Sequence, residues 1–575
     1  MGKTLRAAFK TAETGFDPAQ VSDVYSNDII RAIFDPLLTY DWLARPAKLV
    51  PNVAVSLPQV NQDATEYTFQ IKPGIYFADH PVFKGQKREL VAADFVYSIK
   101  RILDPATRSP NLYMFEGKFA GADALIEAAR KSGKFDYDAP MAGLQAPQRY
   151  TLKIKLNKSD FKLPFLLATV NTGAVAREVV QAYSLQDIMA HPVGTGPYKL
   201  KEWVRGAKMV LEANPDYREE IFHATPQAGD AQDAQIMRQM QGKRLPQIGR
   251  IEVAVMDESQ PRWLAFLAGD LDYTIVPSDF VARVFPGGQL APELKQAGII
   301  WQKEVAPGTF YSFFNLDDAQ FGGYTPERIA LRRAIIYAYR LNEEIAHYYS
   351  NMAMPAHGPL SPGVLGYDPA WRSARQDLQL ARALLERYGY KDRDGDGWRE
   401  APDGKPLELV RGSTPSSQDQ VLDEVWKRSM DALGIRIRFI KQKWPDLLKM
   451  ARQGQLPTWG IGWAAQIPDG DTYLQLLYGP NKEANNLARF DLPAFNQRYE
   501  KAAGLPHGPA RDRLYLEMQQ LAVAYGVWHM GVHRVESHLL QPRLLGYKIH
   551  PFLTNAWKYM DIDKDIKAQH ISQDK

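Results

Sequence analysis

Apolar residues recur along the chain with two different periods. Alternation of apolar and polar positions at 67–71 and 152–156 predicts half-buried strands. Spacings of three and four residues predict helices at 93–103, 328–349, 378–388 and 418–433. Gly389 and Gly434 follow the last two helices and suit left-handed caps. Strands and helices therefore alternate, which indicates an α/β fold.

A strand–helix–strand unit occurs twice in this pattern. The first has a strand at 251–255, a helix at 260–268 ended by Gly269, and a strand at 272–276. The second has its elements at 435–439, 445–453 ended by Gly454, and 458–463. Such units build parallel or mixed sheets, with ligands bound beyond the carboxyl ends of the strands. Two copies predict two α/β lobes of related design, with chance recurrence of a common unit as the alternative.

The composition is that of a globular protein with more than one core. Of 575 residues, 45% are hydrophobic and 24% are charged. The net charge of +4 comes from interspersed residues, and no basic stripe with aromatics predicts a nucleic-acid partner. No apolar run approaches the roughly 18 residues of a membrane-spanning helix.

Cysteine is absent from the sequence. This excludes zinc–thiolate sites, iron–sulfur clusters, disulfides and a cysteine nucleophile, and it fits an oxidising compartment. The first residues, MGKTLRAAF, lack the apolar segment of a signal peptide. We therefore expect either a cytosolic protein or a mature exported protein from which the signal peptide has been removed.

Common catalytic motifs are also missing. The chain has no Gly-x-Gly-x-x-Gly, Walker, His-Glu-x-x-His or Gly-x-Ser-x-Gly sequence. His529 and His533 have a spacing that could hold a metal on a helix, but Gly531 and the β-branched neighbours favour an extended segment. On a strand the two imidazoles would stand over about 12 Å apart. We expect structural or surface histidines.

An Asp- and Gly-rich segment at 392–397 resembles the start of a calcium-binding loop. The candidate ligands are Asp392, Asp394, Asp396, Glu400 and Asp403. Against calcium, the last position holds Asp instead of the longer Glu, and 404–410 is typical of a strand. A hairpin loop without an ion is the alternative, and our expectation for the chain is no cofactor and no metal.

The segment 459–473 suggests a binding cleft. Trp459 and Trp463 flank glycines that include Gly462, at the end of a predicted strand. Glycines let a ligand approach the backbone, and tryptophans supply flat apolar walls. Asp469 and Asp471 follow, at a helix start. The alternative is a Trp-rich core strand that turns into a capped helix.

Several segments together resemble the extracellular solute-binding proteins of ABC transporters, family 5, typified by oligopeptide- and dipeptide-binding proteins. They are YTFQIKPGIYF at 67–77, VAADFVYSIKR at 91–101, PVGTGPYKL at 192–200, LEANPDY at 211–217, RRAI at 332–335 and the segment 389–407. The strand that leads into 463–469 completes the series. These matches run in order over nearly the whole chain.

The resemblance implies a two-lobe periplasmic-binding-protein fold with two interlobe crossovers. Lobe I would span 1–310, with an extra subdomain inserted at about 45–185. Lobe II would span 311–526, and 527–575 would return to lobe I and form the C-terminal tail. The lobes would close over a solute by hinge motion, and the closed form would dock on an inner-membrane permease.

The resemblance also suggests ligand contacts. In peptide binders of the family, an Asp three residues after the Trp pairs with the ligand's α-ammonium; here that position is Gln466. Either Asp469 or Asp471 replaces it, or the ligand has no free α-amine there. Backbone groups at 463–465, including Ala465, could pair with an extended ligand.

For lobe I, the first cleft loop of the family falls at Tyr25, Ser26 and Asn27, which could equally form a helix cap. We therefore expect a non-enzymatic, monomeric periplasmic receptor for a peptide or peptide-like solute. The alternative is a carboxylate-dependent hydrolase that uses Asp469 and Asp471 across a Trp-lined cleft.

Overall fold

The computed structural model describes residues 2–374, 376–482 and 484–571. The chain divides into two compact units. Unit 1 contains residues 1–303 and 537–575, and unit 2 contains residues 304–536. Residues 304–310 and 527–536, expected in the first lobe, lie in unit 2 in this division. A membrane-spanning helix is not found among the described residues, since none of their helices combines the required length with an apolar sequence.

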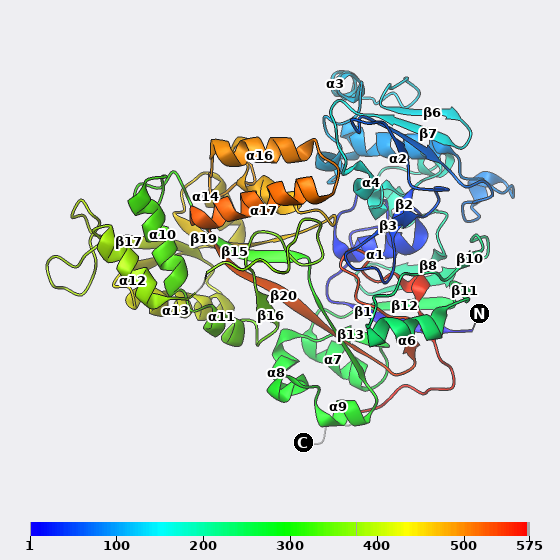
Figure 1. Cartoon of the computed structure of the whole chain (residues 1–575). Coiled ribbons are helices and arrows are strands. Elements are labelled where there is room, and N and C mark those ends of the chain that lie inside the picture. The colour runs from blue at the N-terminus through cyan, green and yellow to red at the C-terminus, as the bar shows by residue number, and fades with distance from the viewer. Residues whose placement is uncertain (1, 375, 483, 572–575) are drawn as a thin grey trace. The chain divides into compact units, whose positions relative to one another are not determined.

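The described part of unit 1 contains two four-stranded sheets and three two-stranded ones; its elements are labelled in Figure 1. Its strands are β1 (Thr4–Phe9), β2 (Leu38–Tyr40), β3 (Leu49–Pro51), β4 (Gln59–Val60), β5 (Glu66–Gln70), β6 (Leu144–Gln148), β7 (Thr151–Lys155), β8 (Tyr198–Val204), β9 (Lys208–Ala213), β10 (Glu220–Ile221), β11 (Arg244–Leu245), β12 (Arg250–Val255), β13 (Tyr273–Ile275), β21 (Leu544–Leu545) and β22 (Asp561–Ile562). Its α-helices are α1 (Val24–Ile33), α2 (Ala92–Leu103), α3 (Ala122–Ser132), α4 (Leu163–Leu166), α5 (Arg177–Gln181), α6 (Ala231–Met240), α7 (Ser259–Leu267), α8 (Val281–Val284) and α9 (Pro292–Gln296).

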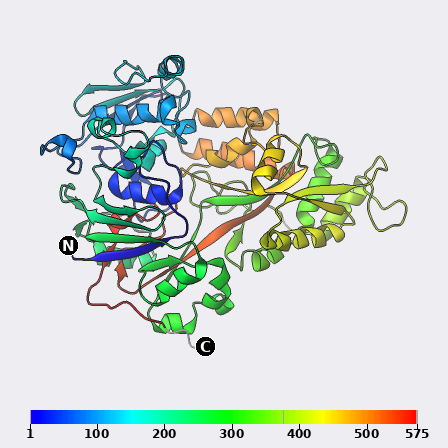
Figure 2. The ribbon, with the colours of Figure 1, turned by 180° about the vertical axis from the view of Figure 1, so that it is seen from behind.

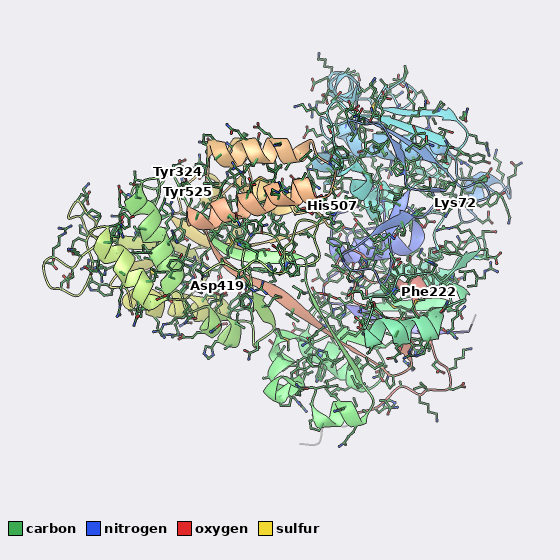
Figure 3. All side chains as sticks on the ribbon, in the orientation of Figure 1. Lys72, Phe222, Tyr324, Asp419, His507 and Tyr525 are labelled. Carbon is green, nitrogen blue, oxygen red and sulfur yellow. The ribbon has the colours of Figure 1, made fainter. Side chains whose placement is uncertain are left out.

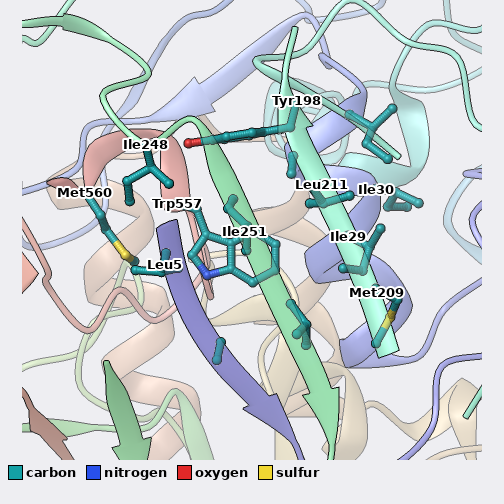
Figure 4. Packing of buried hydrophobic residues seen from close by; sticks show 14 of the residues in the cluster. Leu5, Ile29, Ile30, Tyr198, Met209, Leu211, Ile248, Ile251, Trp557 and Met560 are labelled. Carbon is teal, nitrogen blue, oxygen red and sulfur yellow. The ribbon is translucent and has the colours of Figure 1, made fainter. Parts of the chain in front are cut away.

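One four-stranded sheet of unit 1 has the order β1-β12-β9-β8, and the other, β4-β5-β7-β6, lies within the segment expected as an inserted subdomain. In the first sheet, Leu5, Ile251 and Leu211 stand side by side on neighbouring strands. Ile29 and Ile30 of α1 belong to the same buried cluster, which Figure 4 shows from close by. Burial of each such side chain contributes about 1.5–3 kcal/mol, so this row holds α1 on the sheet.

Unit 2 is a mixed sheet with helices on both sides. Its strands are β15 (Gly308–Phe314), β16 (Ala353–Pro355), β17 (Glu408–Ser413), β18 (Arg436–Lys441) and β19 (Thr458–Ala464). Two further strands, β14 (Ile300–Val305) and β20 (Trp528–Leu540), contain the points where the chain passes between the units. The helices are α10 (Pro326–Ala338), α11 (Leu341–His347), α12 (Leu378–Arg387), α13 (Ser417–Asp431), α14 (Trp444–Arg452), α15 (Asp471–Leu474), α16 (Pro493–Ala503) and α17 (Pro509–Ala524).

The strands of unit 2 follow the order β20-β15-β19-β17-β18. β15 is antiparallel to both neighbours, whereas β17 runs parallel to β18 and β19. The helices α16 and α17 lie on one side of this sheet, and α12 and α13 lie on the other (Figures 1 and 2). Buried residues of α10, α12 and α13 form the core of the unit against the sheet. The carboxyl ends of β17 and β19 therefore open at the same edge.

The predicted helices and strands are present, with two differences. The prediction of one continuous helix at 328–349 is wrong, because α10 ends at Ala338 and α11 begins at Leu341. Tyr339 between them is extended and packs its ring 4.5 Å from Trp426, and the Arg340 amide donates to Ser429 Oγ at 3.2 Å. These tertiary contacts replace the helical bonds that the periodicity predicted.

The second difference concerns the pairing of the two strand–helix–strand units. All six elements exist, as β12, α7 and β13 and as β18, α14 and β19. However, β12 and β13 belong to different sheets, and β17 lies between β18 and β19. Periodicity identifies a strand but not its partner, which is set by long-range packing. Gly389 and Gly434 adopt the predicted left-handed conformation.

Candidate functional site

A cavity of about 210 Å³ lies inside unit 2, at the carboxyl ends of β17 and β19. The two parallel strands are paired at one position only, Arg411 with Thr458. The described residues form no further pair between these strands, and the first turns of α13 contribute Asp419 (Figure 3), Asp423 and other residues to the wall. A crevice at the carboxyl ends of parallel strands is the usual place for a ligand in an α/β sheet.

Two glycines of β19 make this geometry possible. A Cβ atom on Gly462 would lie 2.3 Å from the ring of Phe310, its partner on β15. A Cβ atom on Gly460 would lie 2.7 Å from Arg411 Nη2. Both glycines therefore lie at close approaches: Gly462 leaves room for an aromatic ring, and Gly460 leaves room for the end of a guanidinium side chain.

Arg411 lines the cavity from β17 and is 4% exposed. Its guanidinium carbon lies 4.3 Å from the centre of the Trp426 ring, in a cation–π arrangement. Burial lowers the pKa of Arg411, against the opposing charges of Tyr339 and Asp423. The Arg411 side chain lies on the same face of β17 as the buried Leu409, two residues earlier.

The break between α10 and α11 forms a second wall. The Tyr339 hydroxyl donates to Glu344 Oε2 at 2.6 Å, and both side chains are buried. Burial raises the pKa of Glu344, although the Tyr339 hydrogen bond and the Arg411 charge act in the opposite direction. Arg534 of β20 completes the lining, with its guanidinium carbon 3.9 Å from the ring centre of Phe310.

The predicted tryptophans occupy different positions in β19. Trp459 is buried and lines the cavity together with Gly462, and its ring centre lies 6.0 Å from that of Trp444. Trp463 is half-buried and pairs with Thr309 of β15. On its other edge, β19 pairs with β17 only at Thr458. In the described part of unit 2, the edge from 460 to 464 is therefore open to an extended ligand.

The loop after β19 separates the predicted ligand residues. Ala465 is buried and its amide donates to the Pro307 carbonyl at 2.7 Å, whereas Gln466 is exposed. The Asp469 carboxylate is fully buried and receives two bonds from Arg511, at 2.7 and 2.9 Å. This geometry therefore does not support Asp469 as a ligand contact, because its carboxylate is buried and already paired with Arg511.

Asp471 is also engaged within unit 2. Its amide donates to Asp469 Oδ1 at 2.9 Å. Burial raises the pKa of Tyr499 well above its usual range, and the charge of Asp471 and a hydrogen bond to it add to this effect. The two carboxylates thus support the loop that follows β19.

In unit 1, the three residues predicted for the first cleft loop form the first turn of α1. Asp23 caps this helix, and its carboxylate accepts a bond from the Ser26 amide. Ser26 is buried, and Asn27 accepts a bond from Asn171 Nδ2 at 3.2 Å. Tyr25 is half-buried, with its ring 4.8 Å from that of Phe9. The helix-cap alternative describes their local structure, while a ligand contact stays a prediction.

The candidate calcium loop is a hairpin in which carboxylates accept hydrogen bonds from the backbone of the loop itself. Oxygen atoms of Asp392, Asp394 and Glu400 lie within 4.8 Å of one another. Asp392 accepts bonds from the amides of 395 and 397 at 2.8 and 2.9 Å. Asp396 pairs with Arg436, and Asp403 pairs with Lys405. The expectation that this loop holds no metal stays a prediction, with calcium as the alternative.

His529 and His533 lie on β20, so the predicted extended segment is present. Both are buried, and His533 Nδ1 lies 3.0 Å from the Gly308 carbonyl oxygen. Among the described residues, neither histidine belongs to a group of side chains spaced for a metal ion.

Known proteins provide an independent comparison. The family model for bacterial extracellular solute-binding proteins, family 5 (middle), matches residues 48–485, which is more than half of the chain. The chain belongs to this family. It is 25% identical over 570 residues to di/tripeptide-binding protein 2 of Pseudomonas aeruginosa, covering 98% of this chain and 95% of that protein. It is 23% identical to heme-binding protein A of Haemophilus influenzae, covering 96% and 91% respectively.

Solved structures share the fold of this family 5 protein. The unliganded open form of the periplasmic murein tripeptide-binding protein MppA matches with a TM-score of 0.74 and 21% identity, covering 97% of each chain. HbpA2 from Haemophilus parasuis matches with a TM-score of 0.76 and 18% identity, covering 97% of this chain and all of that one. The predicted two-lobe α/β fold class is confirmed. The family and these relatives are binding proteins, so the chain is a solute-binding receptor and the hydrolase alternative is not supported.

Sequence analysis did not identify Arg411, Tyr339 or Glu344. A signal for Arg411 was present, because it continues the alternation of Leu407 and Leu409 into the buried face of a strand. A charged side chain on the buried face of a strand is costly unless a counter-charge or a ligand pairs with it. No comparable signal existed for Tyr339 and Glu344, which meet only because α10 breaks.

Proposed function

We propose that this receptor binds a peptide or peptide-like solute along the open edge of β19. The observation that carries the proposal is the single pairing between β17 and β19, which leaves the edge from 460 to 464 without a neighbouring strand in the described part of unit 2, next to the cavity. An extended peptide bonds to such an edge as an added strand, and a neighbouring pocket takes one of its side chains. The di/tripeptide-binding relative supports the same class of solute.

The exposed Gln466 predicts which charge the solute carries near this edge. A neutral amide accepts hydrogen bonds but does not offset a buried ammonium group. Asp469 is enclosed by Arg511, so it does not supply the missing charge. A solute with a blocked or absent α-amine at this point therefore fits better than an ordinary free peptide.

The first test is native mass spectrometry of protein purified from a bacterial host, followed by identification of what denaturation releases. Short peptides or peptide-like molecules would support the proposal. A released mass with no amide linkage would contradict it. Incubation of the released solute with fresh protein should return it intact, since we propose binding without turnover.

A substitution at Gln466 tests the preference for the α-amine. Gln466→Asp should raise the affinity for tri-alanine relative to N-acetyl-tri-alanine by on the order of 10-fold, as measured by calorimetry. Gln455→Asp, at another exposed glutamine, is the matched control and should not alter this ratio.

We also propose that the receptor is a monomer in the periplasm. It would deliver its solute to an inner-membrane ABC permease. The family description as extracellular proteins supports the location. Closure of the two lobes over the solute remains a prediction, which small-angle scattering with and without the released solute would check.

A further inference from the structure

A second cavity lies in unit 1, between α2 and β6, the strand at one edge of its sheet (Figure 1). Its volume is about 620 Å³, within the roughly 300–1,000 Å³ typical of sites that hold a whole small molecule. Residues of α2, of the segment 137–141, of β6 and of α5 line it. All of them belong to unit 1, whereas the cavity at β17 and β19 belongs to unit 2.

Lys100 of α2 lines this cavity as a buried cation that is 3% exposed. Its ammonium group donates to the carbonyl oxygens of Tyr137 and Ala139 at 2.9 and 2.7 Å. An ammonium group has three donors, so one is left for a further acceptor. The two carbonyls are neutral and do not offset the charge, and burial lowers the pKa of Lys100.

The carboxylates near Lys100 are engaged by other groups. Asp138 accepts two bonds from Arg177, at 2.5 and 3.0 Å. Asp136 accepts the backbone amides of Asp138 and Ala139 at 3.0 and 3.1 Å. Both carboxylates act on Lys100 through their charge, but in the described part of the chain neither forms an ion pair with it.

The other two carboxylates of the cavity, Asp94 and Glu178, pair with Arg88. Arg88 donates to Asp94 at 2.6 and 3.0 Å and to Glu178 at 2.9 and 3.3 Å. The two arginines of the lining therefore have carboxylate partners. Lys100 is the cation of this cavity that has no salt bridge among the described residues.

The rest of the lining indicates what kind of anion would fit. Tyr97 lies three residues before Lys100 on α2, and its hydroxyl forms no hydrogen bond within the described part of the chain. Val96, Met141 and Leu144 are among the apolar side chains of the wall. One uncompensated positive charge is balanced by one negative charge, and apolar walls favour an organic chain over a hydrated inorganic ion.

We propose that this cavity of unit 1 is a second binding site, that it takes a small apolar carboxylate, and that Lys100 is its anion-binding residue. The carboxylate accepts the third hydrogen bond of the Lys100 ammonium group and a hydrogen bond from the Tyr97 hydroxyl. Charge-assisted hydrogen bonds of this kind are among the stronger ones in proteins. The inference does not rest on the peptide proposed for unit 2.

The test measures binding of hexanoate, hexanamide and inorganic phosphate to the full-length protein by calorimetry. Hexanoate and hexanamide share one apolar chain and differ in charge, and phosphate is an anion without such a chain. Lys100→Met removes the charge and keeps an unbranched side chain. Lys72→Met (Figure 3) is the matched control, because Lys72 also donates to a backbone carbonyl and burial also lowers its pKa, but it lies outside the cavity.

A second pair of variants tests the location of the site without altering a charge. Ala146 is exposed on β6 and lines the cavity, so Ala146→Trp fills part of the cavity. Ala142→Trp, at an exposed alanine outside the lining, is its control. Circular dichroism and Tm check the folding of each variant, and Ala146→Trp keeps the test decisive if Lys100→Met does not fold.

We expect the wild type to bind hexanoate more tightly than hexanamide or phosphate by on the order of 10-fold. Lys100→Met should abolish the preference for hexanoate over hexanamide, and Ala146→Trp should weaken hexanoate binding by on the order of 10-fold. Both control variants should bind hexanoate as the wild type does.

Three results would overturn the inference. Equal binding of hexanoate and hexanamide by the wild type, or a preference kept in Lys100→Met, would exclude Lys100 as the anion-binding residue and leave it a structural link to the segment 137–139. Unchanged hexanoate affinity in Ala146→Trp would place hexanoate outside this cavity. Tighter binding of phosphate than of hexanoate would contradict the class of ligand. Each result leaves peptide binding by unit 2 unaffected, because all the variants lie in unit 1.

Discussion

Arg511 holds Asp469 from inside unit 2 through two hydrogen bonds of 2.7 and 2.9 Å, with both side chains almost fully buried. Burial alone would lower the pKa of Arg511, but the Asp469 carboxylate outweighs it and raises this pKa. Tyr515 adds a third bond to the carboxylate at 2.9 Å. The pair fixes the loop after β19, because the Asp471 amide also binds Asp469 Oδ1.

Loss of this pair should destabilise the protein. Asp469→Asn leaves Arg511 buried without a counter-charge, so we expect the free energy of unfolding to fall by about 3–5 kcal/mol. Urea unfolding followed by circular dichroism measures the change. Asp446→Asn, at an exposed carboxylate on α14, is the control and should stay within about 0.5 kcal/mol of the wild type. Equal stability of the two variants would show that the pair is not structural.

A pH-dependent contribution is expected from Glu220 in unit 1. Burial alone would raise its pKa, but Lys558 and Arg218 outweigh burial and lower the pKa of Glu220 from 4.5 to about 2. A carboxyl group with a lowered folded-state pKa stabilises the fold above its unfolded pKa, and this contribution is lost as the pH falls through the folded pKa. The loss therefore occurs between pH 4.5 and about 2.

Glu220→Gln should remove that contribution. At about pH 7 its free energy of unfolding should be lower than that of the wild type by about 2–4 kcal/mol, and the difference should shrink as the pH approaches about 2. Denaturant unfolding at a series of pH values measures both. Glu219→Gln, at the exposed neighbour, is the matched control. A difference that stays constant with pH would contradict the assigned cause.

The sequence specifies the elements of this fold better than their partners. Leu152 and Ile154 alternate with polar residues, and that local pattern suffices to place β7. The position of β17 between β18 and β19 depends on contacts between distant segments, which no local period records. For the same reason the break at Tyr339 was not predicted, since its cause is the packing of Trp426.

The candidate site shows the same division. The glycines and tryptophans of β19 marked the correct strand, and Trp459 and Gly462 do line the cavity. The residue types alone did not show which charged side chains face the cavity. Asp469 resembles a ligand contact in the sequence but is enclosed by Arg511, whereas Arg411, which the sequence did not single out, is among the charged residues that line the cavity.

Arg411 should lower the stability of the ligand-free protein. An unpaired buried cation costs several kcal/mol, and the contact with Trp426 returns at most about 2 kcal/mol. Arg411→Met removes the charge and keeps apolar contact with the ring, so its Tm without ligand should equal or exceed that of the wild type. Differential scanning calorimetry on ligand-stripped protein measures this. A Tm several degrees lower would indicate that Arg411 supports the fold.

The two glycines of β19 should respond differently to the same substitution. In Gly462→Ala the new methyl group meets the Phe310 ring at 2.3 Å, between paired strands, and overpacking there should cost about 1–3 kcal/mol of unfolding free energy. In Gly460→Ala it meets Arg411 Nη2 at 2.7 Å, the end of a long side chain that is able to shift. We therefore expect nearly unchanged stability in Gly460→Ala, because the guanidinium group moves aside.

Urea unfolding of both variants measures the two changes in the free energy of unfolding. Gly504→Ala, where the added atom meets nothing closer than 3.8 Å, is the control for the substitution itself. A loss of stability in Gly460→Ala as large as that in Gly462→Ala would mean that the Arg411 side chain does not shift.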